Sequence, residues 1–167
     1  MLAYCAFCKT SLEEKAARQI NWLYGAQGIC AIAPVRILKE RRGGIESQVR
    51  RPLLPGYVLI YANECLQPGL MHAVEHVLRL LCYPGGEYEL HGGDLAYADF
   101  VYGNHGVIGI SDILCEGKEA KILSGPLEDC KGTIVRLDHR KQRVWMRVYF
   151  DGVEREISLG ANILTAI

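Results

Sequence analysis

The segment RVWMRVYF, Arg143 to Phe150, indicates a β-strand because apolar residues alternate with other residue types along its whole length. Side chains along a strand point alternately to its two faces. One face would carry four apolar side chains: Val144, Met146, Val148 and Phe150. The other would carry two arginines and two aromatic rings: Arg143, Trp145, Arg147 and Tyr149. Burying one apolar side chain stabilises a fold by about 1.5–3 kcal/mol, so the first face is expected to be the core.

The residues on both sides of this strand predict a small β-barrel. Asp151-Gly152 follows it directly, and this dipeptide favours a two-residue hairpin turn in which both residues have positive φ. Short runs separated by turns complete the pattern: AKILS at 120–124, TIVRLD at 133–138, VEREIS at 153–158 and NIL at 162–164. Five short strands between residues 115 and 167 predict a barrel of the SH3-like kind.

The loop SGPLEDCKGT, residues 124–133, resembles the phosphate-binding loop of nucleotide enzymes but does not meet its requirements. That motif needs glycine, four residues, then Gly-Lys-Ser/Thr at the start of a helix. Here Cys130 stands five positions after Gly125, and Lys131 precedes Gly132 instead of following a glycine. Two acidic residues in the loop would also repel an anion, and the next segment alternates like a strand. We therefore expect a connector between strands.

The beginning of the chain predicts a strand followed by a helix. LAYCAFCKT, residues 2–10, is short, apolar and aromatic, and SLEE, beginning at Ser11, matches the capping box that starts helices. Gly25 is placed to end the helix. Between them apolar residues recur at helical spacing: Leu12, Ala16, Ile20 and Leu23.

The next residues predict an α+β domain with helices packed on an antiparallel sheet, at 1–102. GICAIAPVRILKE at 28–40 indicates a strand entering a basic loop, and Tyr57–Tyr61 indicates a buried strand. Pro68 can begin a second helix, and residues 94–102 indicate a third. The second helix would carry an apolar stripe: Met71, Val74, Leu78 and Leu81. A glycine-rich linker is expected at 103–115 and the barrel domain at 116–167.

Charge and composition limit the classes of function. The chain has 19 basic and 19 acidic residues, so a nucleic-acid site would have to be a local patch. Residues 36–51 hold six basic and two acidic residues, which fits either a solvated hairpin arm or a nucleic-acid contact. The sequence has no membrane-span pattern and no signal peptide pattern, so a cytoplasmic protein is expected. A monomer without cofactor or metal is also expected.

Seven cysteines fit a reducing compartment better than a disulfide framework. Cys5 and Cys8 have the spacing of metal or redox pairs, but no second close pair follows. Residues three apart on a strand also point to opposite faces. A thiol or metal protein that uses Cys5 and Cys8 is kept as a distant alternative.

The outer face of residues 143–150 is suited to RNA. Arginine contacts phosphate, and an aromatic ring provides a stacking surface worth about 1–3 kcal/mol per base. Lys131, Arg140 and Lys141 in adjoining loops would extend the positive area. The alternative is that Trp145 folds over the barrel edge or packs against the first domain, and that the arginines are merely solvated.

Three stretches, in this order, resemble the NusG family of transcription elongation factors. YCAFCKTSLEEKAARQI at 4–20 and RRPLLPGYVLIY at 50–61 resemble the first strand and helix, and the Pro-Gly-Tyr strand, of the NusG N-terminal (NGN) domain. AKILSGPLEDCKGTIVRLDHRKQRVWMRVYFDGVEREISLG at 120–160 resembles a KOW domain. The resemblance covers nearly the whole chain.

The resemblance implies a factor that is not an enzyme. In this family the NGN domain binds the clamp helices of RNA polymerase beside the DNA of the transcription bubble and suppresses pausing, and the KOW domain binds Rho, a ribosomal protein or RNA. The residues implied to contact polymerase are Phe7, Leu54, Pro55, Gly56, Tyr57, Met71 and His72. The residues expected to contact an RNA hairpin are Lys131, Arg136, His139, Arg140, Lys141, Arg143, Trp145 and Arg147.

Some residues depart from the housekeeping pattern of the family. The first strand has Ala3-Tyr4 where Trp-Tyr is usual, and Asp129 stands where many members have glycine. With the aromatic and basic KOW face, these features resemble a specialised paralogue of the LoaP type, which implies processive antitermination and a KOW domain that binds structured RNA. The alternative within the family is a general NusG whose KOW domain binds Rho or a ribosomal protein.

Overall fold

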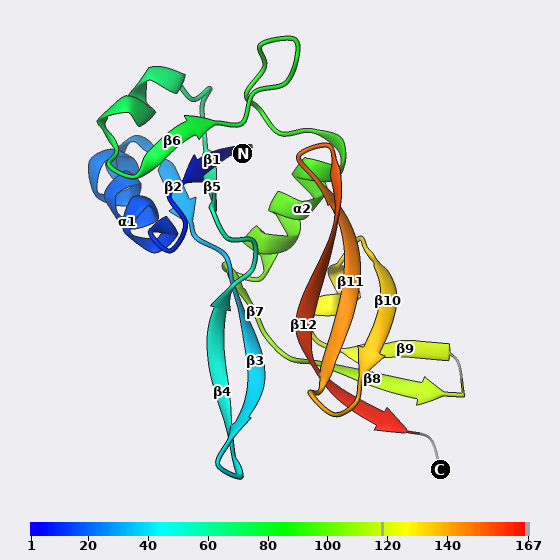
Figure 1. Ribbon diagram of the computed structural model, residues 1–167. Helices are drawn as coiled ribbons and strands as arrows, with labels where there is room; N and C mark the ends of the chain where they lie inside the picture. The colour runs from blue at the N-terminus through cyan, green and yellow to red at the C-terminus, as the bar shows by residue number, and fades with distance from the viewer. Residues whose placement is uncertain (118, 166–167) are drawn as a thin grey trace. The chain divides into compact units, whose positions relative to one another are not determined.

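The computed structural model describes residues 1–117 and 119–165 and divides into two compact units (Figure 1). The first unit consists of Met1–Pro34 and Leu54–Ala98, and the second of Val35–Leu53 and Asp99–Ile167. The chain mixes helices with sheets in which most strand pairs are antiparallel, so the predicted α+β class is confirmed. Residues 118, 166 and 167 of the predicted barrel domain lie outside the described residues.

The first unit is built on a four-stranded antiparallel sheet in the order β2-β5-β1-β6. Its strands are β1 (Leu2–Cys8), β2 (Ile29–Ile32), β5 (Tyr57–Ala62) and β6 (Val77–Leu80). One face of the sheet packs against helix α1 (Glu13–Tyr24), which a short 3-10 turn, η1 (Gly25–Gln27), follows. Tyr4, Ile20 and Ile60 belong to this core. By alternation, Phe7 and Tyr57 lie on the opposite face.

Helix α1 forms where the apolar spacing predicts it, but the predicted capping box is wrong. Ser11 has a φ of 70°, and Leu12 occupies the N-cap position without a side-chain cap. Glu13 is buried, and its carboxylate accepts a hydrogen bond from the Gly56 backbone nitrogen at 2.6 Å. The Glu13 side chain therefore binds the loop before β5 instead of capping helix α1.

The helix predicted from Pro68 to Leu81 is also wrong. Residues Pro68–Ala73 form a short 3-10 helix, η2, and the chain then becomes strand β6. β6 pairs with the free edge of β1, which would otherwise leave its backbone groups unpaired. Of the apolar stripe, Leu78 is 63% exposed, so its members do not share one buried face.

The third predicted helix is confirmed as α2 (Gly92–Gly103). The hydroxyl of Tyr61 in β5 donates a hydrogen bond to the Ala98 carbonyl oxygen at 2.7 Å, so the first half of α2 lies against the sheet face opposite α1. The boundary between the two units falls within α2, after Ala98.

The second unit contains a five-stranded sheet in the order β10-β11-β12-β8-β9. Its strands are β8 (Ser111–Glu116), β9 (Glu119–Ser124), β10 (Thr133–Asp138), β11 (Arg143–Phe150) and β12 (Val153–Thr165). The four apolar residues of β11 are all buried, as the alternation predicts. Asp151 and Gly152 both have positive φ and join β11 to β12, which confirms the predicted hairpin turn.

Two strands lie in the stretch predicted as a linker, 103–115: β7 (Val107–Ile108) and most of β8. β8 is the fifth strand of the sheet. The segment NIL, which was expected to be a separate strand, instead continues β12 and pairs with β8 in parallel. Ser111, Ile113 and Cys115 of β8 are buried in alternation. Because Ser111 is polar and glycines lie nearby, this alternation cannot be recognised as a strand pattern in the sequence. The domain boundaries at 102 and 116 remain a prediction.

The loop between β9 and β10 is a connector that includes the 3-10 helix η3 (Pro126–Asp129). Gly125 has a φ of 97°, and a Cβ there would lie 2.8 Å from the Ser111 Cα. A Cβ at Gly132 would lie 2.9 Å from the Arg147 carbonyl oxygen. Both glycines are therefore required by close backbone approach, as a strand connector needs.

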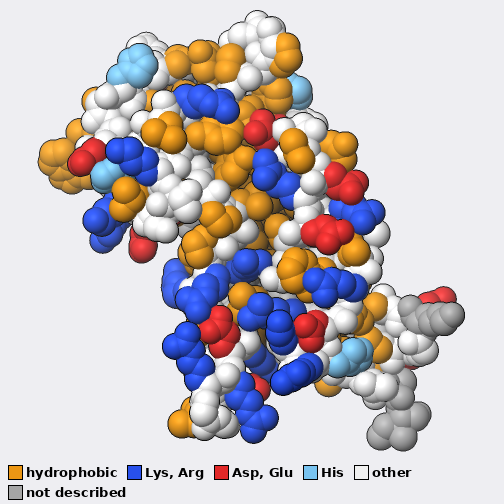
Figure 2. Space-filling view, in the orientation of Figure 1, with side chains coloured by type: hydrophobic (Ala, Val, Ile, Leu, Met, Phe, Trp, Pro, Cys, Tyr) orange, Lys and Arg blue, Asp and Glu red, His pale blue; other side chains and the backbone are white. Residues whose placement is uncertain are grey.

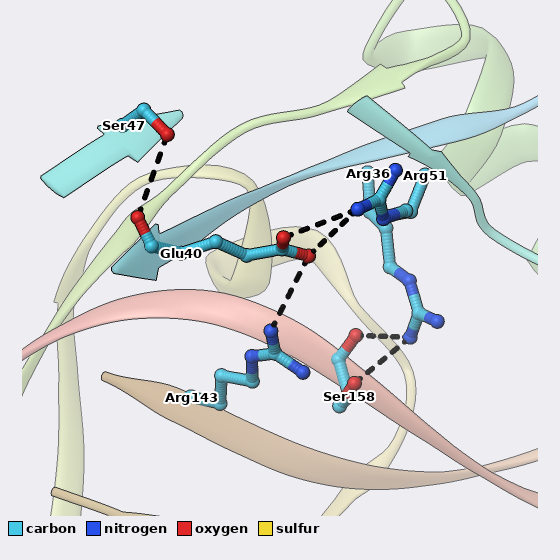
Figure 3. A network of polar contacts seen from close by, with 6 residues as sticks. All are labelled: Arg36, Glu40, Ser47, Arg51, Arg143 and Ser158. Atoms are coloured by element: carbon cyan, nitrogen blue, oxygen red, sulfur yellow. Dashed lines mark hydrogen bonds and ion pairs between the residues drawn. The ribbon is translucent and has the colours of Figure 1, made fainter. Parts of the chain in front are cut away.

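The basic segment forms a β-hairpin that belongs to the second unit. β3 (Val35–Arg42) pairs with β4 (Ile45–Pro52), and β7 adds to β3 in parallel. The hairpin contacts β12: the Arg36 guanidinium donates to the Ser158 carbonyl oxygen and, at 3.0 Å, to its hydroxyl (Figure 3). A Cβ at Gly160 would lie 2.4 Å from the Ile37 carbonyl oxygen, so glycine permits this contact.

Candidate functional site

An aromatic and cationic cluster lies across three strands of the first unit. The strand register places Phe7 opposite Tyr57 on one side and opposite Arg79 on the other. The Phe7 and Tyr57 ring centroids are 4.8 Å apart, and the Arg79 guanidinium carbon is 4.0 Å from the Phe7 ring centroid. Phe7 and Tyr57 are half-buried and Arg79 is exposed. We call these three residues the aromatic patch; such surfaces are typical of protein-binding sites.

The Pro-Gly turn next to the aromatic patch is fixed by hydrogen bonds. The Cys8 backbone nitrogen donates to the Gly56 carbonyl oxygen at 2.8 Å, and the Gly56 nitrogen donates to Glu13. Gly56 has a φ of 87°, which disfavours any other residue. Pro55 is exposed. Gly56 therefore holds the turn in place, and Pro55 offers surface beside Tyr57.

The other residues implied to contact polymerase differ in exposure. His72 is exposed on η2, whereas Met71 is 3% exposed within the core cluster and Leu54 is 7% exposed. Met71 and Leu54 thus offer almost no side-chain surface in this structure. Sequence reasoning missed Arg79, because the segment that holds it was expected to be a helix; the register of β6 with β1 is what places it over Phe7.

The outer face of β11 is already partly occupied by neighbouring side chains. The Arg136 guanidinium carbon lies 4.1 Å from the Trp145 ring centroid. Arg147 forms ion pairs with Glu154 at 3.0 Å and Glu156 at 3.2 Å. Exposed pairs of this kind contribute about 0–1 kcal/mol each, but they reduce the local positive charge. Tyr149, 59% exposed, is the most open ring on this strand.

The remaining residues expected to contact RNA lie at two ends of β11. Lys131 is exposed in the loop before β10, and the Thr133–Arg147 pairing puts that loop near Arg147. His139, Arg140 and Lys141 are exposed in the turn between β10 and β11, at the Arg143 end. Four residues of strand separate these ends by about 13 Å. The eight predicted residues therefore lie at both ends of β11 and along its outer face between them.

The properties of the cysteines do not support thiol chemistry at Cys5 and Cys8. Both side chains are buried. Burial raises the pKa of the Cys8 thiol to about 12, and the nearby negative charge of Glu13 acts in the same direction. A nucleophilic cysteine needs a lowered pKa, the opposite shift. Among residues 1–117 and 119–165, no group of three His, Cys, Asp or Glu side chains is arranged to hold a metal ion.

The helices found in the described part of the chain are all too short or too polar to cross a membrane.

Comparison with known proteins identifies the fold. No protein-family profile matches the chain, and no curated protein matches it. Among solved structures, one reported as "Domain interaction in Thermotoga maritima NusG" matches with a TM-score of 0.51 and 20% sequence identity. The match covers 95% of this chain and 93% of the other. The chain therefore has a NusG-like fold, an NGN-type α+β part with a KOW barrel, as its sequence predicts.

Proposed function

We propose that this protein is a bacterial transcription elongation factor that binds RNA polymerase through the first unit. The observation that carries this proposal is the aromatic patch, a cross-strand group of Phe7, Tyr57 and Arg79 beside an exposed Pro55. Two rings that contact each other at an interplanar angle of 53°, with an adjacent guanidinium, combine apolar area with a cation, as energetically important interface residues do. The NusG-like fold of the chain supports the same assignment.

Polymerase co-purification tests this proposal. A tagged Phe7→Ala/Tyr57→Ala variant should lose RNA polymerase, because it removes both rings of the aromatic patch, and should keep the circular dichroism spectrum of the original protein. Trp22→Ala is the matched control, since Trp22 is an exposed aromatic residue on α1. Polymerase retention by a folded double variant would contradict the assignment.

RNA binding by the second unit is the other half of the proposal. It is supported by the exposed basic residues at both ends of β11 and by the exposed ring of Tyr149. A factor held on a transcript hairpin by its KOW barrel would be loaded onto selected transcripts, where it would make polymerase resistant to termination signals. Ala3 and Asp129, which depart from the housekeeping pattern, support this LoaP-type specialisation.

A protein partner for the barrel is the second candidate. Several apolar side chains of the second unit are exposed: Leu123, Val135, Tyr149 and Val153. Exposed apolar groups favour contact with a protein such as Rho or a ribosomal protein over contact with phosphate. Capture of either protein by the tagged factor, without retention of RNA, would favour this candidate.

A further inference from the structure

The second unit contains a cavity of about 700 Å³ between the β3–β4 hairpin and the turn that joins β10 to β11. The hairpin contributes residues 39–42, Gly44 and Glu46, and the barrel contributes residues 140–143. Both walls belong to the same compact unit. We call this cavity the basic cleft. It joins the two basic segments of the sequence, which lie far apart along the chain.

The basic cleft has a strong positive charge. Six of its residues are basic and two are acidic, which leaves a formal charge of +4. Glu40 accepts two hydrogen bonds from Arg51, at 3.0 and 3.1 Å, and Arg51 lies outside the lining (Figure 3). The negative charge of Glu40 is therefore largely neutralised by Arg51, which does not line the cleft. Figure 2 shows Lys and Arg side chains gathered over this part of the second unit.

The Arg143 guanidinium in the cleft has only a distant acidic partner. Its side chain is 20% exposed, and its nearest acidic partner, Glu40, is 4.0 Å away. Its Nε atom is buried and has no hydrogen-bond partner among the described residues. The buried Nε is not accessible to a ligand, so contact falls to the terminal nitrogens, one of which lies 4.0 Å from Glu40. Such nitrogens suit an oxyanion, because a phosphate can accept two N–H groups at once.

The two walls of the cleft are held together by a chain of hydrogen bonds. Lys39 Nζ donates to Asn162 Oδ1 at 2.6 Å, and Asn162 Nδ2 donates to Asp112 Oδ1 at 2.7 Å. Arg36 binds Ser158 on the same strand, β12. The hairpin is thus fastened to the barrel, and a ligand would not have to assemble the site.

We propose that the basic cleft binds the sugar–phosphate backbone of RNA, so that the β3–β4 hairpin supplies half of the RNA site. This inference rests on the proposed RNA-binding function and assigns its main phosphate contact. The lining has no aromatic residue on which a base could stack, and it presents Lys and Arg on both walls. Such a site contacts phosphates, which fix position without reading sequence. Tyr149 and the side of Trp145 that Arg136 does not cover remain for stacking elsewhere on the barrel.

Fluorescence anisotropy of the full chain with a labelled RNA hairpin of arbitrary sequence tests the cleft. If about four phosphates are neutralised, the logarithm of affinity should fall against the logarithm of salt concentration with a slope of about −3 to −4. Arg42→Gln removes a charge from the β3–β4 wall of the cleft, and Lys141→Gln removes one from the barrel wall. Each should weaken binding and reduce the slope by about one, and the double variant by about two. Arg18→Gln on α1 removes the same charge from the first unit and should change neither.

The outcomes separate this inference from the proposed function. If the unmodified protein does not bind the RNA hairpin at about 50 mM salt, RNA binding itself is wrong. If it binds and Lys141→Gln weakens binding while Arg42→Gln behaves like Arg18→Gln, the barrel binds RNA without the β3–β4 segment. The cleft inference is then wrong. Equal affinity for a DNA hairpin of the same sequence would overturn the RNA assignment. Thermal unfolding of each variant by circular dichroism excludes loss of fold.

Discussion

The Arg136 guanidinium carbon lies 4.1 Å from the Trp145 ring centroid, so an arginine of β10 covers one face of the indole of β11. The strand register places these two residues opposite each other. Arg136 and Trp145 are both expected to contact RNA, but in this structure they contact each other. Only the uncovered side of the indole can meet a base.

Removal of Arg136 should expose the Trp145 ring without unfolding the barrel. In a Trp22→Phe background, which leaves Trp145 as the single tryptophan, Arg136→Ala should shift the fluorescence emission to longer wavelength. The loss of unfolding free energy should stay below about 1 kcal/mol, because exposed cation–π pairs contribute about 0.5–1 kcal/mol. Arg140→Ala, in the exposed turn, should leave the emission unchanged. An unshifted spectrum for Arg136→Ala would show that the pair does not persist in solution.

Alanine at Gly160 should destabilise the second unit. The added Cβ would lie 2.4 Å from the Ile37 carbonyl oxygen and 3.0 Å from Ile110 Cγ1, so the hairpin backbone would have to move. Overpacking of this kind costs about 1–3 kcal/mol, which urea denaturation can measure. Gly69→Ala is the control, because nothing lies within 4 Å of its Cβ position. Equal stability of the two variants would mean that β12 and β3 are not in close contact.

The carboxylate of Asp112 should stabilise the second unit near neutral pH, and this stabilisation should be lost at low pH. Hydrogen bonds from Asn162 and Ser124 lower the pKa of the Asp112 carboxyl below its ordinary value. A lowered folded-state pKa stabilises the fold above the unfolded-state pKa, about 3.9, and this contribution disappears as the pH falls through the folded-state value. Asp112→Asn should therefore unfold at lower urea concentration than the original protein near pH 6, and the two should converge in acid.

The control for this pH dependence is Asp99→Asn, which changes an exposed aspartate of α2. Its urea midpoint should differ little from that of the original protein near pH 6. A difference between Asp112→Asn and the original protein that persists unchanged into strong acid would assign the effect to the altered amide and not to the carboxylate charge.

Local patterns in the sequence predict the elements whose signals are complete within a few residues. The alternation of β11 and the Asp151-Gly152 turn are of this kind, because a period of two and a positive φ need no distant partner. The stripe from Met71 to Leu81 fits a helix just as well as the observed turn and strand, and only the unpaired edge of β1 decides between them. Long-range pairing overrode the local pattern there.

The candidate sites show the same limit. Phe7 and Tyr57 could be named because the segments that hold them resemble the NusG family. Arg79 could not, because its position over Phe7 depends on the register of β6. The basic cleft depends on packing of the hairpin against β12, which no pattern within either segment encodes. Sequence reasoning found both basic segments but had no means to bring them together.

The membership of the β3–β4 hairpin in the second unit has a consequence for dissecting the protein. The chain passes from one unit to the other after Pro34, Leu53 and Ala98, so neither unit is a continuous piece of sequence. A cut before β8, at 103–110, would leave Arg36 on one fragment and Ser158 on the other. An isolated C-terminal fragment would retain the barrel strands but lose one wall of the basic cleft. Its affinity for RNA would therefore understate that of the intact chain.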